Sequence, residues 1–102
     1  MNQAVAFQPT DQLFARLHEI TMEMKSPKTA ITTPLADAFV GTLEEIALHK
    51  PGAFKARKHE FAQAVGGVVR SLPSKDRTGF AEHLEKDYPK VFGVVAEEYG
   101  IA

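Results

Sequence analysis

Two His-Glu dipeptides are the first residues in this sequence whose types suggest chemistry. His18-Glu19 and His59-Glu60 begin the zinc protease motif, which needs a second histidine three residues after the glutamate so that both imidazoles share one helical face. Those positions hold Met22 and Gln63. The sequence therefore does not predict a zinc hydrolase site at either dipeptide.

Histidine–carboxylate pairs at helical spacing are the second signal. Glu45 stands four residues before His49, and His83 stands four residues before Asp87. Such pairs can hold a metal ion or tune a base, but a metal site needs three or four converging ligands and each pair supplies two. We therefore expect ordinary ion pairs on solvated helices, with no metal and no cofactor.

Other signatures of catalysis are missing from the sequence. The chain has no cysteine, which excludes thiol nucleophiles, disulfides and thiolate zinc sites. Gly66-Gly67 is followed by Val68-Val69 rather than by Lys-Ser or Lys-Thr, so it is not a phosphate-binding loop. No nucleophile-elbow motif surrounds Ser26, Ser71 or Ser74. We expect the chain to be a binding protein and not an enzyme.

The charge is distributed unevenly along the 102 residues, although the formal net charge is only −1. Residues 46–80 hold seven Lys and Arg against two Asp and Glu. Residues 1–45 hold three basic against six acidic side chains, and residues 81–102 hold two against five. A basic middle segment is therefore hidden between two acidic flanks.

Helical geometry arranges part of this basic charge into a strip. At about 100° per residue, Lys55, His59 and Arg70 fall beside the apolar face of a predicted helix over residues 53–72. Gly66 lies between them and would allow an anionic surface to approach closely, whereas Lys58 falls inside the apolar arc. The predicted partner-binding residues are Lys55, Arg57, Lys58, His59, Arg70, Lys75 and Arg77.

Three interpretations of the basic strip are open. It can bind an acidic protein or a second copy of this chain, whose acidic flanks would meet it. It can bind DNA, because residues 35–72 loosely resemble a helix-turn-helix with cations in the first turns of the second helix. It can also be an ordinary solvated face. The pI of 6.4 lies below the value of about 9 typical of nucleic-acid binders. We therefore favour a regulator or inhibitor that docks on an acidic protein partner and forms a homo-oligomer.

Proline and glycine divide the sequence into five predicted helices. Apolar residues at three- and four-residue spacing place them at about 11–25, 33–49, 53–72, 74–88 and 89–99. Thr10 and Thr33 are the predicted N-caps of the first two helices. Gly66-Gly67 predicts a kink in the third helix or a close approach of another backbone, and Gly100 a left-handed residue after the last helix.

The expected architecture is an all-α bundle of four to five short helices, forming one domain over residues 1–102 with a flexible N-terminus at 1–9. Tyr88, Phe92 and Tyr99 form an aromatic stripe that belongs to the core or to a docking face. The sequence shows neither a signal peptide nor an apolar run long enough to span a membrane, so we expect a cytoplasmic protein with no membrane partner.

Overall fold

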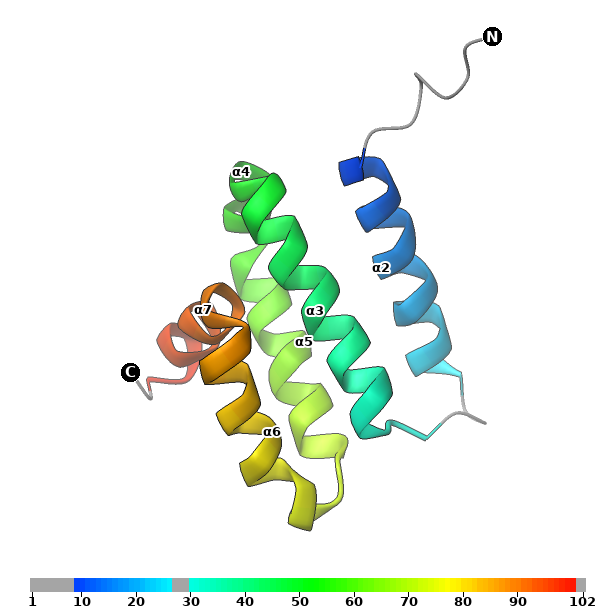
Figure 1. Cartoon of the computed structure of the whole chain (residues 1–102), viewed down its shortest axis with the longest axis vertical. Coiled ribbons are helices and arrows are strands. Elements are labelled where there is room, and N and C mark those ends of the chain that lie inside the picture. The colour runs from blue at the N-terminus through cyan, green and yellow to red at the C-terminus, as the bar shows by residue number, and fades with distance from the viewer. Residues whose placement is uncertain (1–8, 27–29, 101–102) are drawn as a thin grey trace, which may run out of the picture.

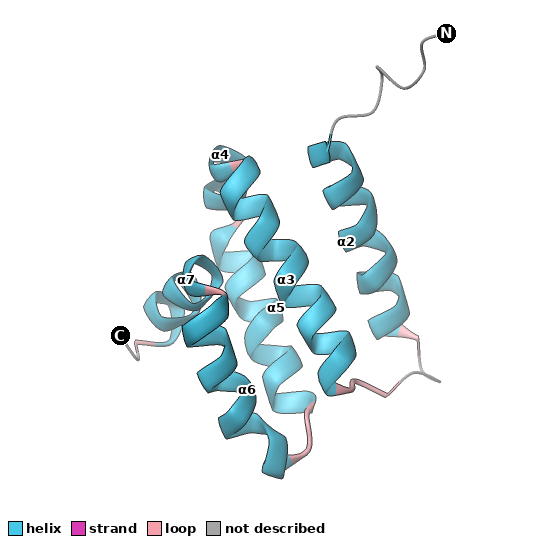
Figure 2. Cartoon of the chain, viewed as in Figure 1, coloured by secondary structure: helices cyan, strands magenta, loops and turns pink. Residues whose placement is uncertain are grey.

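In a computed structural model, which describes residues 9–26 and 30–100, the chain forms an all-α bundle (Figures 1 and 2). Its helices are α2 (Pro9–Lys25), α3 (Thr33–His49), α4 (Pro51–Ala56), α5 (Lys58–Ser71), α6 (Ser74–Asp87) and α7 (Pro89–Tyr99). The all-α prediction is confirmed, with six helices in the described ranges rather than four or five. None of these six could cross a membrane. Residues 1–8, most of the predicted flexible segment, lie outside the described part.

Helix α3 lies at the centre of the bundle and packs against all five other helices. Its sequence is apolar on most of its circumference, which is the pattern of a buried helix. The buried residues of α3 are Ala36, Phe39, Val40, Thr42, Leu43, Glu44, Ile46 and Ala47. Glu44 is the one charged side chain among them, so its environment needs a specific explanation.

The predicted N-caps of the first two helices, Thr10 and Thr33, are both wrong. Helix α2 begins at Pro9, where the missing N–H of proline is tolerated, so the predicted cap Thr10 lies inside the helix. The N-cap of α3 is Thr32 and not Thr33, because the Thr32 hydroxyl accepts a hydrogen bond from the backbone N–H of Leu35 at 3.3 Å. Two adjacent threonines before Pro34 offer the same chemistry, which is why the sequence does not distinguish them.

The predicted helix over residues 53–72 is two helices that meet at Arg57. Helix α4 begins two residues before the predicted start and ends at Ala56, and Arg57 leaves helical geometry with φ −115° and ψ 20°. The rings of Phe54 and Phe61, one from each helix, stack in the core with centroids 5.7 Å apart. Neither glycine nor proline marks this break, so the sequence carries no local signal for it.

Gly66-Gly67 does not interrupt the helix, because α5 continues through both glycines. The close approach at Gly66 comes from a side chain instead of a backbone: a Cβ added there would lie 2.8 Å from Cζ of Tyr99. A Cβ added at Gly67 would meet no atom within 4 Å. The first glycine therefore makes room for α7, whereas the second faces open space.

The N-terminus of α7 is capped by a side chain of α3. Glu44 is 7% exposed, and its two carboxylate oxygens accept hydrogen bonds from the backbone N–H groups of Lys90 at 3.2 Å and Val91 at 2.9 Å. Helix α7 begins at Pro89 and has no capping side chain of its own. A carboxylate at this position satisfies unpaired N–H groups and favours the positive end of the helix dipole. Glu44 thus joins α7 to the central helix.

Helix α7 buries a different face from the predicted aromatic stripe. Val91, Val95 and Ala96 are its buried residues, while Tyr88 and Phe92 are only half-buried and Tyr99 is 42% exposed. The aromatic rings pack along the edges of the apolar face instead of at its centre. Gly100 has φ +68°, which confirms the left-handed residue predicted after this helix.

Replacing Glu44 tests the importance of its cap. We expect Glu44→Ala to lower the free energy of unfolding by about 2–3 kcal/mol, because two N–H groups near the protein interior lose a charged acceptor. Urea unfolding measures the change. The matched control is Glu45→Ala on the same helix, whose exposed ion pair with Arg16 contributes about 1 kcal/mol or less. Equal losses in the two variants would contradict the role assigned to Glu44.

Candidate functional site

The seven predicted partner-binding residues do not lie on one helix face. Lys55 belongs to α4, Arg57 lies between α4 and α5, and Lys58, His59 and Arg70 belong to α5. Lys75 and Arg77 belong to α6. Because the helix breaks at Arg57, the single helical wheel that aligned Lys55 with Arg70 does not describe this surface.

The acidic end of α7 meets two of the predicted cations. Lys58 Nζ lies 3.0 Å from Glu97 Oε1, and His59 Nδ1 lies 2.6 Å from Glu98 Oε1. Gln63 also donates a hydrogen bond to Glu98, at 3.2 Å. These contacts lower the pKa of Glu98, mainly through His59 and then through Gln63. Part of the basic strip is therefore neutralised within the chain.

Gly66, the glycine in the predicted strip, is covered by α7 as well. The Tyr99 ring lies on Gly66, and the Arg70 guanidinium lies 6.0 Å from the centroid of that ring. From the sequence, we expect an anionic partner to approach Gly66 closely, beside the cations. The chain's own α7 occupies this position instead.

Arg57 and Arg77 bind groups of the chain near the two ends of α5. Arg57 forms two hydrogen bonds to Glu60, at 3.1 and 2.7 Å, which raise the pKa of Arg57 and lower that of Glu60. Arg77 donates to the carbonyl oxygens of Leu72 at 3.0 Å and Arg70 at 2.7 Å. These contacts secure the start of α5 and the turn into α6.

A hollow of about 390 Å³ lies where α4, α5 and α7 meet near the end of α3. Three lysines line this cationic hollow, Lys55, Lys58 and Lys90, and its single acidic residue is Glu97, already paired with Lys58. Within the described ranges, Lys55 and Lys90 have no carboxylate within ion-pair distance. Sequence reasoning found Lys55 and Lys58 but missed Lys90, because only the fold brings the start of α7 beside α4.

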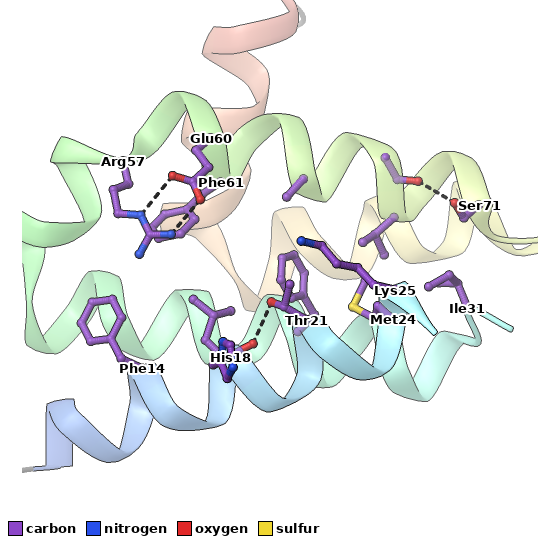
Figure 3. Close-up of a pocket in the computed structure, with 15 residues that line it drawn as sticks. Phe14, His18, Thr21, Met24, Lys25, Ile31, Arg57, Glu60, Phe61 and Ser71 are labelled. Atoms are coloured by element: carbon purple, nitrogen blue, oxygen red, sulfur yellow. Dashed lines mark hydrogen bonds and ion pairs between the residues drawn. The ribbon is translucent and has the colours of Figure 1, made fainter. Parts of the chain in front are cut away.

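A larger groove, of about 650 Å³, lies on the other side of α5 (Figure 3). Helices α2 and α5 form its walls, and Phe39 of α3 contributes to its floor. Helix α2 packs mainly against α3 and makes few contacts with the other helices, which leaves this α2–α5 groove open. Phe14 and Arg57 lie at one end of the groove, and Lys25 and Ser71 lie at the other (Figure 3).

His83 forms the densest polar cluster among the described residues, with partners from two other segments. Its Nε2 lies 2.6 Å from Asp37 of α3, its Nδ1 lies 2.7 Å from Asp87, and the Tyr88 hydroxyl donates to Asp37 at 2.8 Å. The two carboxylates, Asp37 first, raise the pKa of His83. Burial, then Asp37, raises the pKa of Tyr88 to about 12. This cluster connects α3, α6 and the start of α7.

The helical spacing of His83 and Asp87 thus predicts a real contact, whereas Glu45 pairs with Arg16 at 3.3 Å instead of with His49. The His83 cluster lines neither the cationic hollow nor the α2–α5 groove. No three His, Cys, Asp or Glu side chains in the described ranges are grouped so that they could hold a metal ion. The two hollows are therefore the better candidates for a functional surface.

Comparisons with models of protein families, with curated proteins and with solved structures found no match to this chain.

The His83 cluster predicts a pH dependence of stability. Because the folded pKa of His83 is raised, its stabilising contribution is complete below its unfolded pKa of 6.5 and is lost as pH rises through the folded value. We expect the loss to be about 1 kcal/mol or less, since the His83 side chain is 38% exposed and solvent screens both pairs. Urea unfolding between about pH 5.5 and 8.5 measures it.

His83→Gln should flatten this part of the pH profile, because glutamine has no charge to lose. His49→Gln is the control, since His49 is exposed and has no ion pair within the described ranges. If His49→Gln flattens the pH profile as much as His83→Gln does, the His83 cluster is not the source of the pH dependence.

Proposed function

We propose that this chain is a non-enzymatic binding protein that docks on a larger protein and regulates it by covering part of its surface. The supporting observation is the cationic hollow, in which three lysines face one acidic residue that is already paired. A carboxylate of a partner can add to Lys55 and Lys90 without displacing a contact within the chain. The partner expected at this hollow is an acidic segment of a protein.

The hollow offers apolar contact as well as charge. Pro51, Gly93 and Val94 contribute to its lining between the lysines. Opposite charge speeds and orients the encounter of two proteins, while apolar contacts excluded from water supply much of the affinity. A partner segment that alternates acidic and apolar side chains fits this lining better than a uniformly charged polyanion does.

DNA is less well supported as a ligand. The proposed helix-turn-helix unit at residues 35–72 corresponds to α3, α4 and α5, with the six-residue α4 between the two longer helices. The cations expected to reach bases or phosphates are Lys55, Arg57, Lys58 and His59, and all of them except Lys55 contact a carboxylate of the chain. DNA binding would have to break these pairs first. Self-association of the chain into a homo-oligomer, which the sequence predicts, is also part of this proposal.

Charge reversal at the hollow tests the proposal. A fluorescein-labelled peptide of alternating glutamate and leucine serves as the probe, and fluorescence anisotropy at low and moderate salt measures its affinity. We expect Lys55→Glu/Lys90→Glu to weaken binding at least about tenfold, or about 1.4 kcal/mol. The matched control is Lys75→Glu/Lys86→Glu on α6, which makes the same change in net charge away from the hollow.

Three outcomes would count against the proposal. Equal weakening by both double variants would mean that the peptide responds only to net charge, and absence of binding to the wild type would remove the acidic ligand. A gel shift of duplex DNA that declines steeply between about 50 and 200 mM salt and is abolished by Lys55→Glu/Lys90→Glu would assign the hollow to nucleic acid.

A further inference from the structure

The α2–α5 groove has the form of a four-helix bundle from which one helix is missing. Helix α3 lies at one corner, and α2 and α5 occupy the two adjacent corners (Figure 1). No helix of the described ranges occupies the corner diagonal to α3, and the groove opens there. We propose that this groove binds an amphipathic α-helix of a partner protein. This inference concerns a second surface and rests on the proposed function only in that the chain acts by binding.

The wall formed by α5 allows a helix to approach closely. Ala64, Gly67 and Ser71 line the groove at spacings of three and four residues, so they form a stripe of small side chains. A Cβ added at Gly67 would meet no atom within 4 Å, which shows that the space above the stripe is open. Packed helices lie about 8–10 Å apart, and small side chains at the contact permit the shorter distance.

The opposite wall and the floor supply apolar surface. Phe14 and Met24 of α2, Ile31 of the α2–α3 connection and Phe61 of α5 line the groove (Figure 3). Phe14, Met24 and Ile31 are only partly buried in the chain alone, whereas Phe61 is buried. A helix with an apolar face would remove this surface from water, as in other helix-in-groove complexes.

The length of the groove sets the length of the bound helix. Its lining runs from Phe14 to Lys25 on α2 and from Arg57 to Ser71 on α5. At a rise of about 1.5 Å per residue these segments span about 16–21 Å, which corresponds to a helix of about 11–14 residues.

The directions of the walls set the orientation of the bound helix. Helices α2 and α5 run parallel, since Phe14 and Arg57 mark one end of the groove and Lys25 and Ser71 the other (Figure 3). A helix antiparallel to both places its positive N-terminus beside their negative C-terminal ends, as in an up-and-down bundle. Its first turn then lies near Lys25, which has no ion pair within the described ranges. The structure therefore favours a partner helix with Asp or Glu in its first turn.

A second copy of this chain fits the groove less well. If each copy placed its α2 in the groove of the other with the two helices antiparallel, the two-fold axis would put α3 of the second copy where α5 lies. The parallel arrangement avoids this overlap but brings Lys25 near Lys25 of the second copy at one end of the interface. A different protein is therefore the occupant that charge and geometry favour.

A displayed library of amphipathic helices about 14 residues long, with random residues in the first and last turns, tests this inference. We expect peptides enriched on the wild-type protein to carry Asp or Glu in the first turn. Gly67→Leu should weaken the best peptide at least tenfold, because a leucine side chain fills the open space above the small stripe. Lys25→Glu should weaken it about tenfold by reversing the charge that its first turn meets.

Gly79→Leu is the matched control for Gly67→Leu. Gly79 lies on α6, its added Cβ also meets no atom within 4 Å, and it does not line the groove. Circular dichroism and urea unfolding show whether each variant folds. Binding that survives Gly67→Leu, or enriched peptides with Lys or Arg in the first turn, would overturn the inference.

Two further measurements separate the possible failures. Lys55→Glu/Lys90→Glu should bind the selected helix as the wild type does, because neither lysine lines the α2–α5 groove. A wild-type protein that binds the selected helix but not the peptide of alternating glutamate and leucine would therefore count against the cationic hollow alone. Sedimentation equilibrium reports the oligomeric state. A dimer that becomes monomeric in Gly67→Leu, and that the selected helix dissociates, would assign the groove to a second copy and overturn the choice of a different protein.

Discussion

The carboxylate of Glu44 is the polar contact on which the arrangement of this bundle depends. A buried charge is costly unless it is paired, and the two N–H groups at the start of α7 supply the partners that Glu44 needs. The same contact fixes where α7 begins on α3 and hence where its far end lies. The His83 cluster adds a second connection between α3 and the α6–α7 corner, closer to solvent.

The position of α7 in turn decides which cations of the chain are available to a ligand. Its C-terminal residues Glu97, Glu98 and Tyr99 cover one side of α5 and take Lys58, His59 and Arg70 as partners. Two of the cations that have no carboxylate partner within the described ranges, Lys55 and Lys90, line the cationic hollow. A strip that the linear sequence presents as one surface is therefore divided by the chain's own helix into a covered part and an open part.

The two sides of α5 have different surroundings in the fold. Helix α7 covers one side closely, to the point that Gly66 is needed to accommodate Tyr99. Helix α2 packs against α3 and leaves the other side of α5 open at Gly67, where partly buried apolar side chains line the α2–α5 groove. The asymmetry places two surfaces of different chemistry, one cationic and one apolar, on opposite sides of the same helix.

The sequence by itself determined the all-α class, the approximate extent of α2, α3, α6 and α7 and the left-handed Gly100, because apolar periodicity, proline and glycine act over a few residues. It also identified the excess of positive charge in the middle of the chain. Only the tertiary structure decided the break at Arg57, the role of Glu44, the partners of Lys58 and His59, and the addition of Lys90 to the cationic hollow. Most of these features depend on contacts between residues far apart in the sequence, such as Glu44 and Val91 in the core or Lys58 and Glu97 at the surface. A local sequence pattern does not specify which distant side chains come into contact.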